Sequence, residues 1–287
     1  MKYGLYVPPF GEYADARLLA NLAKDAEVAG WDGFFTWDHL AFSWIDAPVV
    51  DPWIALSAVA MNTTRIRFGP LVTPLPRRRP WKVARETVSL DHLSGGRLIF
   101  GVGLGGGSAE NAAFGDAGDP KELAARLDEG LHVLTGLWSG ETFHYEGRYY
   151  QVKEARFTPP PLQVPRIPIW VGGFWPHRPP FRRAAGWDGV YPLNLDQDQF
   201  LSPDDVREII AYVKKHRATD APFDVAHSGF SPGGDPARAR DTVAPYAAAG
   251  VTWWLDNVNP WRFGWNMQGP WPVEAMRERI RQGPPRL

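Results

Sequence analysis

The chain has 287 residues, 44% of them hydrophobic, which is enough for a sizeable core and is an ordinary length for one β/α barrel. Its 31 basic and 32 acidic residues leave a net charge of −1, which argues against a nucleic-acid-binding surface. Cysteine is absent, and no apolar run reaches the ~18 residues of a membrane helix. Disulfides and thiolate chemistry are therefore excluded. The N-terminus has no signal-peptide pattern, so we expect a soluble, cytoplasmic protein without a membrane partner.

Apolar β-type runs alternate with helical patterns along the whole chain. The runs are Tyr3–Val7, Gly33–Trp37, Arg65–Val72, Arg97–Val102, Pro168–Gly172, Gly189–Leu193, Phe223–Ala226 and Val251–Leu255. Between the first two, Ala16–Ala29 has the apolar spacing of an amphipathic helix. Eight strands that alternate with helices predict parallel strands with right-handed crossovers. We therefore predict a single (β/α)8 TIM barrel over residues 1–287.

Dipeptides of Asp or Ser followed by Pro mark several helix starts, and three insertions interrupt the alternation of strands and helices. The dipeptides are Asp51-Pro52, Asp119-Pro120, Ser202-Pro203 and Asp235-Pro236, each with an N-cap oxygen before a proline. Glu122 adds a capping-box pattern to Asp119. The insertions are Leu40–Val50 after strand two, Gly105–Gly118 after strand four, and Gly140–Ile167 before strand five, with a predicted hairpin at Thr142–Val152. We interpret them as decorations of one domain.

The C-terminal ends of the strands are where a β/α barrel carries its reactive residues. Strand two ends at Trp37, followed by Asp38 and His39. An imidazole can donate or accept a proton near neutral pH, and a neighbouring carboxylate can orient it or bind the N–H of a heterocycle. From its position alone, His39 is as well explained by a structural role as by a catalytic one.

Glycines follow strands four and five. Gly101, Gly103 and Gly106 fit GxGxxG, but the dinucleotide fingerprint belongs to the first strand of a doubly wound sheet, so we favour a loop that admits a planar cofactor or a phosphate. Gly172-Gly173 predicts a phosphate site near a helix start, or alternatively a tight turn with positive φ. Nearby N–H groups would then face the ligand.

Other chemistry has little support in the sequence. The short run Arg77-Arg78-Arg79 predicts a solvated loop, with contact to an anionic cofactor as the alternative. His-x-His and HExxH patterns are absent, so no metal site is predicted. The GxSxG elbow of serine hydrolases is also absent.

Several stretches resemble the bacterial-luciferase-like flavin-dependent oxidoreductases. Residues 65–73 resemble strand three of that family, and residues 84–98, with LDHLSGGRL, are similar to its most recognisable stretch. Further similarity lies in Ala29–Gly33, Trp37–His39, Phe143–Tyr150, Pro168–Gly173 and Arg183–Gly189. The order and spacing hold from Lys2 to about Leu193, and beyond that the match rests on the strand–helix rhythm.

The resemblance implies a cofactor, either FMN or the deazaflavin coenzyme F-420 (F420), at the C-terminal end of the barrel. It implies oxygen insertion with reduced FMN or hydride transfer with F420. Asp38 and His39 match a pair beside the cofactor ring, which makes His39 the candidate for proton transfer and Asp38 a cofactor contact. A non-proline cis peptide of the family maps to Leu71-Val72 or an adjacent bond. The implied cofactor-binding residues are Asp38, Leu71, Val72, Thr73, Gly103, Gly105, Glu110, Gly172 and Gly173. The triple glycine Gly105–Gly107 departs from many members and weakens the transfer of Glu110.

The resemblance and the 14 tryptophans together suggest a small, apolar or aromatic substrate. The candidate pocket residues are Trp44, Phe174 and Trp175, with Trp261 and Trp265 as further candidates. The family also implies a separate flavin or F420 reductase as a partner, and a homodimer through Pro52–Asn62 and Trp81–Leu93. Two alternatives remain open: a noncatalytic flavin-binding barrel and a metal-dependent barrel hydrolase.

Overall fold

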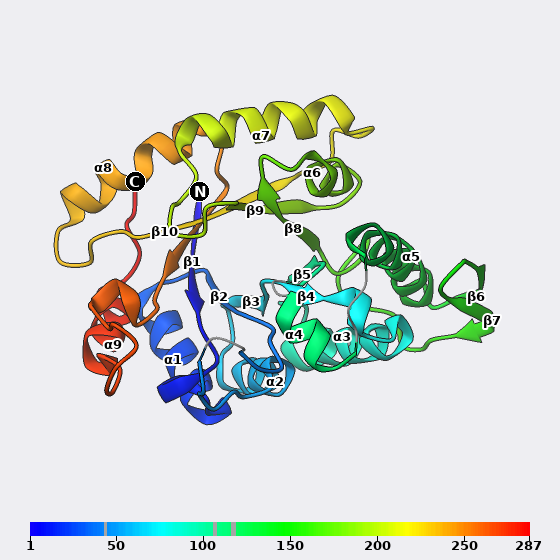
Figure 1. Ribbon diagram of the computed structural model, residues 1–287, viewed down its shortest axis with the longest axis horizontal. Helices are drawn as coiled ribbons and strands as arrows, with labels where there is room; N and C mark the ends of the chain where they lie inside the picture. Colours follow the sequence, from blue (N-terminus) through cyan, green and yellow to red (C-terminus); the bar gives the residue numbers. More distant parts are fainter. Residues whose placement is uncertain (43–44, 106–107, 116–118) are drawn as a thin grey trace.

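Eight parallel strands form a barrel in the computed structural model (Figure 1). The structure describes residues 1–42, 45–105, 108–115 and 119–287. Each barrel strand is called a stave, because one of the eight consists of two segments. The staves are β1 (Lys2–Val7), β2 (Gly33–Thr36), β3 (Arg67–Pro70) with β4 (Thr73–Pro74), β5 (Phe100–Gly103), β8 (Ile169–Trp175), β9 (Gly189–Asn194), β10 (Asp224–Gly229) and β11 (Trp253–Asn257). Neighbouring staves pair in parallel. The predicted (β/α)8 barrel is confirmed.

The third stave is divided, and the division closes the barrel. β3 pairs with β2, whereas β4 pairs with β5. The sheet order β3-β2-β1-β11-β10-β9-β8-β5-β4 therefore begins and ends on one short segment of chain. The peptide bond between Leu71 and Val72, which lies between β3 and β4, is cis, as the family resemblance implied. The third stave is thus interrupted at the place where the candidate site was expected.

Helices cover the outside of the barrel, with α7 and α8 on one side and α1 and α2 on the opposite side (Figure 1). The helices are α1 (Ala16–Ala29), α2 (Pro52–Asn62), α3 (Pro80–Ser94), α4 (Ser108–Ala113), α5 (Pro120–Trp138), α6 (Arg178–Ala184), α7 (Pro203–His216), α8 (Pro236–Ala249) and α9 (Val273–Arg281). Among the described residues, no helix is both long and apolar enough to cross a membrane.

Three of the four predicted helix caps are present. Asp51, Ser202 and Asp235 each accept a hydrogen bond from a backbone N–H of the first turn. Asp119 is also the N-cap residue before Pro120, as predicted, but its side chain makes no such bond, so the predicted capping box is wrong. Glu122 does not reach back to it either. Its carboxylate instead pairs with Arg126 one turn later, at 2.8 Å.

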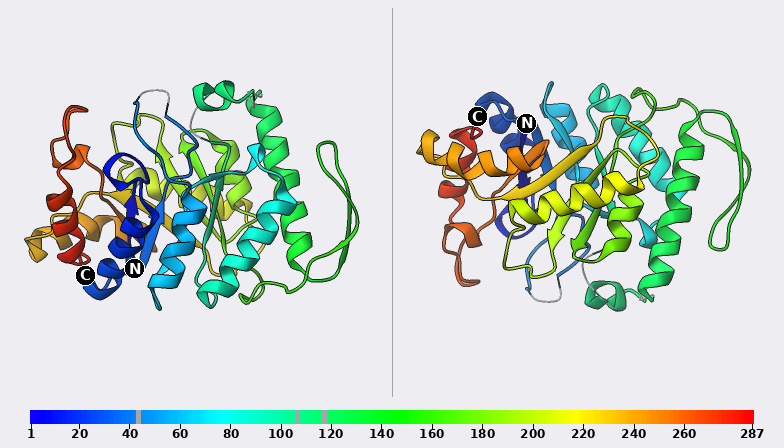
Figure 2. Two further views of the ribbon diagram at one scale, coloured as in Figure 1. Left: turned by 90° about the horizontal axis from the view of Figure 1, so that it is seen from below. Right: turned by 90° about the horizontal axis from the view of Figure 1, so that it is seen from above.

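The insertion before β8 forms an antiparallel hairpin of β6 (Thr142–Glu146) and β7 (Gln151–Arg156), which is longer than predicted. It projects from the side of the barrel, far from α9 (Figure 2). Both chain termini lie at the end of the barrel opposite α4 (Figure 2). The Leu287 N–H donates to the Tyr3 hydroxyl at 3.0 Å, which ties the C-terminus to β1. The C-terminal ends of the staves are left for the loops that build the site.

The core has two parts, one inside the barrel and one between the staves and the helices. The inner part consists of Phe35, Leu71, Ile99, Trp170, Tyr191, Ala226, Trp253 and Leu255. Glycines allow the close approach of staves that this narrow barrel requires. A Cβ at Gly69 would lie 1.8 Å from the Ile99 carbonyl oxygen.

Candidate active site

A cavity of about 990 Å³ opens at the C-terminal ends of the staves. Nine of the predicted site residues line it: Asp38, His39, Leu71, Val72, Gly103, Gly105, Gly172, Gly173 and Phe174. Its volume is at the upper end of the range usual for small-molecule sites, so it can hold an organic cofactor together with a substrate.

Val72 forms one wall of the cavity, and two glycines make room for it. A Cβ at Gly103 would lie 2.6 Å from Val72 Cγ2, and one at Gly172 would lie 2.7 Å from Val72 Cγ1. Gly172 and Gly173 lie inside β8, and neither has a positive φ, so the predicted glycine turn before a helix is wrong. The strand continues to Trp175 because the pairing with β9 extends that far. These glycines are needed for close packing against Val72 and Pro180.

The segment around the cis bond is held from two sides. The Tyr6 hydroxyl donates to the Leu71 carbonyl at 2.7 Å, and the Leu71 N–H donates to the Thr36 carbonyl at 2.8 Å. Burial raises the pKa of Tyr6 well above its ordinary value, so this hydroxyl keeps its proton. The position of Val72 is therefore fixed by β1 and β2. The sequence contained no signal for this use of Tyr6.

His39 pairs with Glu110, and not with its sequence neighbour Asp38. Its Nδ1 lies 2.9 Å from Glu110 Oε2, and the two side chains are 26% and 6% exposed. The second oxygen, Oε1, accepts from the Leu40 N–H and from Arg77 Nη1 at 3.0 Å. Burial acts to raise the pKa of Glu110, but the bonds from His39 and Leu40, with the charges of His39 and Arg77, lower it to about 2. Glu110 is therefore a buried carboxylate that stays ionised.

The carboxylate of Asp38 is fully buried and surrounded by its own partners. It accepts from Arg77 and Arg78 at 2.9 Å each, from Thr73 Oγ1 at 2.8 Å and from Trp53 Nε1 at 3.2 Å. The carboxylate of Asp38 and the hydroxyl of Thr73 thus bind protein groups, including each other, and Thr73 does not line the cavity, whereas the predicted cofactor contact of Asp38 stays a prediction. The predicted solvated loop is wrong for Arg77 and Arg78, which are drawn inward by two carboxylates.

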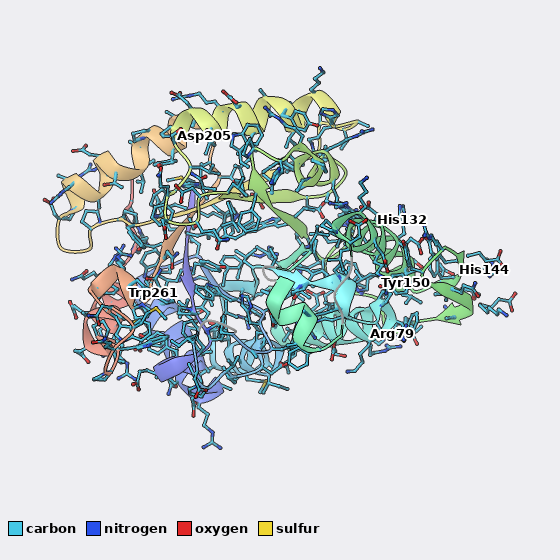
Figure 3. All side chains as sticks on the ribbon, in the orientation of Figure 1. Arg79, His132, His144, Tyr150, Asp205 and Trp261 are labelled. Carbon is cyan, nitrogen blue, oxygen red and sulfur yellow. The ribbon has the colours of Figure 1, made fainter. Side chains whose placement is uncertain are left out.

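Aromatic rings form the wall beside His39. The Phe42 ring lies 4.7 Å and the Trp37 ring 6.1 Å from the imidazole, between ring centroids. Trp261, labelled in Figure 3, lies parallel to Trp37 with 6.4 Å between ring centroids. It comes from the turn after β11, where Arg262 forms an ion pair with the buried Asp256. The C-terminal segment thus completes an apolar wall.

Not every predicted aromatic residue belongs to this wall. Phe174 lines the cavity, but Trp175 is buried against Phe181, at 5.2 Å between ring centroids, and does not line it. Trp265 packs on Trp271 beside a separate hollow. Trp44 lies outside the described residues, as do Gly106 and Gly107.

Basic groups gather at the side of the cavity next to β5 and β8. Lys121, His177 and Arg183 line it there. The Arg183 guanidinium is oriented by Asp128, with Nη2 3.0 Å from Oδ2. Positive charge at this position suits an anionic group such as a phosphate. Of these three residues, only Arg183 lies in a stretch of the sequence that resembles the family.

His227, in β10, was among the strand-end residues that the sequence offered, but it was given no role there. It lies in the cavity wall, 2% exposed, and neither ring nitrogen has a hydrogen-bond partner among the described residues. Its ring stacks on Tyr246 at 4.5 Å between ring centroids. Burial lowers the pKa of His227 to about 4, so the imidazole is neutral at pH 7.

The curated relatives of the chain include uncharacterised and characterised proteins. An uncharacterised protein of Mycobacterium tuberculosis is 30% identical over 231 residues, which are 74% of this chain and 76% of the relative. The F420-dependent hydroxymycolic acid dehydrogenase of M. tuberculosis is 34% identical over 61% of this chain and 49% of its own length. The oxygenase component of flavin-dependent trigonelline monooxygenase of Acinetobacter baylyi is 29% identical over 63% and 50%. The chain thus spans about half the length of the latter two.

Solved structures share the fold. The coenzyme F420 dependent tetrahydromethanopterin reductase from Methanopyrus kandleri superposes with a TM-score of 0.77 at 19% identity and covers 98% of this chain and 96% of its own. The sequence profile of the luciferase-like monooxygenases matches residues 1–266. The chain belongs to the luciferase-like monooxygenase family.

Proposed function

We propose that the protein is an F420-dependent oxidoreductase that transfers hydride to or from a neutral, apolar or aromatic alcohol or ketone. The observation that carries this proposal is the pair of His39 and Glu110, 2.9 Å apart at the wall of the cavity. Interconversion of an alcohol and a ketone requires a proton to move together with the hydride. A histidine backed by an ionised carboxylate is suited to that task.

The residues present fit a tricyclic cofactor with an anionic tail. Val72 and the backbone of Gly103 and Gly172 form a surface free of polar side chains against which a flat ring can lie. Lys121 and Arg183 would hold the phosphate. Bound F420 would supply the acceptor or donor of hydride, and the protein would supply orientation and proton transfer.

The proton path follows from the hydrogen bonds of His39. Because Glu110 is ionised, Nδ1 donates to it and carries the hydrogen, which leaves Nε2 as the proton acceptor. His39 would then take the hydroxyl proton of an alcohol, or return a proton to the oxygen of a ketone. Trp37, Phe42 and Trp261 would hold the apolar part of the substrate and exclude water.

FMN-dependent monooxygenation is the second candidate. The ring surface at Val72 consists of backbone and methyl groups, which an isoalloxazine ring would contact equally well. The relative from Acinetobacter, an oxygenase component, supports this candidate. In that case a separate reductase would supply the reduced flavin. For the first candidate, an F420 reductase would be the partner in the direction of ketone reduction, which consumes reduced F420.

Cofactor titration separates these functions. The purified protein is titrated with F420 and with FMN, and binding is followed by fluorescence. We expect F420 to bind at micromolar concentration and alcohols to reduce it, with turnover falling at least tenfold in His39→Gln while cofactor affinity changes little. Oxygen consumption with reduced FMN would favour the monooxygenase. Binding without turnover, unchanged in His39→Ala, would indicate a noncatalytic flavin-binding barrel.

The homodimer remains a proposal with its own measurement. Helix α2 leaves Ile54 and Met61 exposed at 63% and 71%, and Leu93 of α3 is 47% exposed. These apolar side chains lie on the helices that the family resemblance assigns to the dimer. Light scattering after gel filtration is expected to give twice the monomer mass of 32.1 kDa. A Met61→Lys variant that elutes with the wild-type mass would contradict the use of this face.

A further inference from the structure

Three consecutive arginines follow β4 and take three different positions. Arg77 is 6% exposed and donates to two carboxylates, Glu110 Oε1 at 3.0 Å and Asp38 Oδ1 at 2.9 Å. The guanidinium of Arg78 forms an ion pair with Asp38, also at 2.9 Å. Arg79, labelled in Figure 3, is exposed. Its guanidinium lies over the ring of Trp81. One sequence run therefore supplies a bridging cation, an outer cation and a solvated one.

These contacts form a continuous chain of charges behind His39. Glu110 uses one oxygen for His39 and the other for Arg77, and Arg77 in turn reaches Asp38, which binds Arg78. Two carboxylates and two guanidinium groups balance one another before His39 takes up a proton. Apart from this chain, the described neighbours of the imidazole are the uncharged rings of Trp37 and Phe42.

How strongly a carboxylate stabilises a neighbouring imidazolium depends on which other cations it binds. A buried carboxylate whose only cationic partner is an imidazole stabilises the imidazolium strongly, because ion pairs are little screened there. Such a histidine would keep its proton and would be a poor base. A second cation on the same carboxylate keeps the carboxylate ionised but shares its charge.

We propose that Arg77 is a positioning residue that shares the charge of Glu110, so that His39 can both accept and release a proton. The inference rests on the proposed role of His39 in proton transfer. Arg77 acts through Glu110, since its guanidinium contacts Glu110 and Asp38 and it is not among the residues that line the cavity.

The test compares Arg77→Met with Arg78→Met and Arg79→Met in the full chain without cofactor. The protonation midpoint of His39 is measured by NMR on protein with 13C-labelled histidine, and the signal is assigned with His39→Gln. We expect Arg77→Met to raise the midpoint by about one pH unit, which is the size of shift that one nearby charge produces. Arg78→Met should raise it less, because Asp38 lies between Arg78 and Glu110. Arg79→Met should leave it unchanged.

Arg77→Lys is the second variant, because loss of a buried ion-pair partner can unfold a protein. Lysine keeps the charge but cannot bind both carboxylates with one planar fork, so its midpoint should lie between those of the wild type and Arg77→Met. If Arg77→Met unfolds, Arg77→Lys decides: a midpoint above that of the wild type supports the proposal, and an unshifted midpoint overturns it. A folded Arg77→Met with the wild-type midpoint would overturn the proposal and leave Arg77 as a clamp between loops.

A pH profile of kcat/KM separates this proposal from the proposed function. If both hold, the acid limb in Arg77→Met moves upward by the same amount as the NMR midpoint, and activity below the wild-type midpoint falls about tenfold. A shifted NMR midpoint with an unshifted acid limb would support the role of Arg77 and refute proton transfer by His39.

Discussion

Replacement of Glu110 by glutamine removes one charge from the site at nearly constant size. The native carboxylate accepts from His39 Nδ1 at 2.9 Å and from Arg77 Nη1 at 3.0 Å, and it also accepts from the Leu40 N–H. The amide nitrogen of glutamine would face one of these donors. We therefore expect Glu110→Gln to lose both stability and turnover.

The magnitude follows from the pKa. In the folded protein the pKa of Glu110 falls from 4.5 to about 2, and this difference corresponds to about 3 kcal/mol in favour of the charged form. Because the folded-state pKa is depressed, this stabilisation is present above pH 4.5 and is lost as the pH falls toward 2. The side chain is only 6% exposed, so solvent screening reduces the value little. At pH 7 the variant should be less stable by about 3 kcal/mol.

Urea denaturation, followed by tryptophan fluorescence at pH 7 and at pH 3.5, measures this difference. The gap between wild type and Glu110→Gln should narrow at the lower pH. Glu122→Gln is the matched control, because its pair with Arg126 is exposed and worth at most about 0.5 kcal/mol. A Glu110→Gln protein with the wild-type urea midpoint at pH 7 would refute the reasoning.

Three more changes probe other parts of the site. Gly172→Ala places a Cβ 2.7 Å from Val72, so thermal unfolding should show a loss of about 1–3 kcal/mol and fluorescence titration a weaker cofactor affinity; unchanged affinity would mean that Val72 does not face the ring. Trp261→Leu should raise KM for an apolar substrate more than it lowers kcat, and the reverse pattern in steady-state kinetics would place Trp261 in catalysis. Wild-type stability should fall by about 3 kcal/mol as the pH drops from 6.5 to about 4, because burial depresses the folded-state pKa of His227. In His227→Phe, urea denaturation should show that this part of the pH dependence is lost, and a retained slope would assign it to other groups.

The barrel could be predicted from the sequence because each stave and helix carries a local signal. The signals are the apolar runs of the strands, the prolines at helix starts and the stretches that resemble the family. Each of them depends on residues that are close in the sequence. Asp51, Ser202 and Asp235 cap their helices as expected. At Asp119 the motif predicts the start of the helix correctly but not the side-chain bonds, since Glu122 pairs with Arg126. A short motif therefore predicts where a helix begins more securely than which side chains bond there.

Most of the residues that line the cavity could be predicted from the sequence, but the hydrogen-bond partners of these residues could not. Position at the strand end identified His39, and the adjacent Asp38 was the only carboxylate considered for orienting it before the family resemblance made Asp38 a cofactor contact. The actual partner, Glu110, is 71 residues away, and the barrel brings the two loops together. Arg77 was read as solvated because sequence alone does not show that two carboxylates lie within reach. Charge balance in a buried site is a property of the assembled loops.

The two halves of the site come from different sources, and this explains how one fold serves different reactions. The proposed ring surface is made by backbone, by glycines that leave space, and by Val72 beside a cis peptide held by Tyr6. The proposed acid–base pair and its arginines come from side chains on three segments, which follow β2, β4 and β5. Loop charges can therefore change without disturbing the ring surface, as expected in a family with relatives named as an F420-dependent dehydrogenase and as a flavin-dependent oxygenase component. It follows that substitutions in the linked charged groups should change the reaction that the protein catalyses; these groups are His39, Glu110, Arg77, Asp38 and Arg78. Substitutions at the glycines should instead change the affinity for the cofactor.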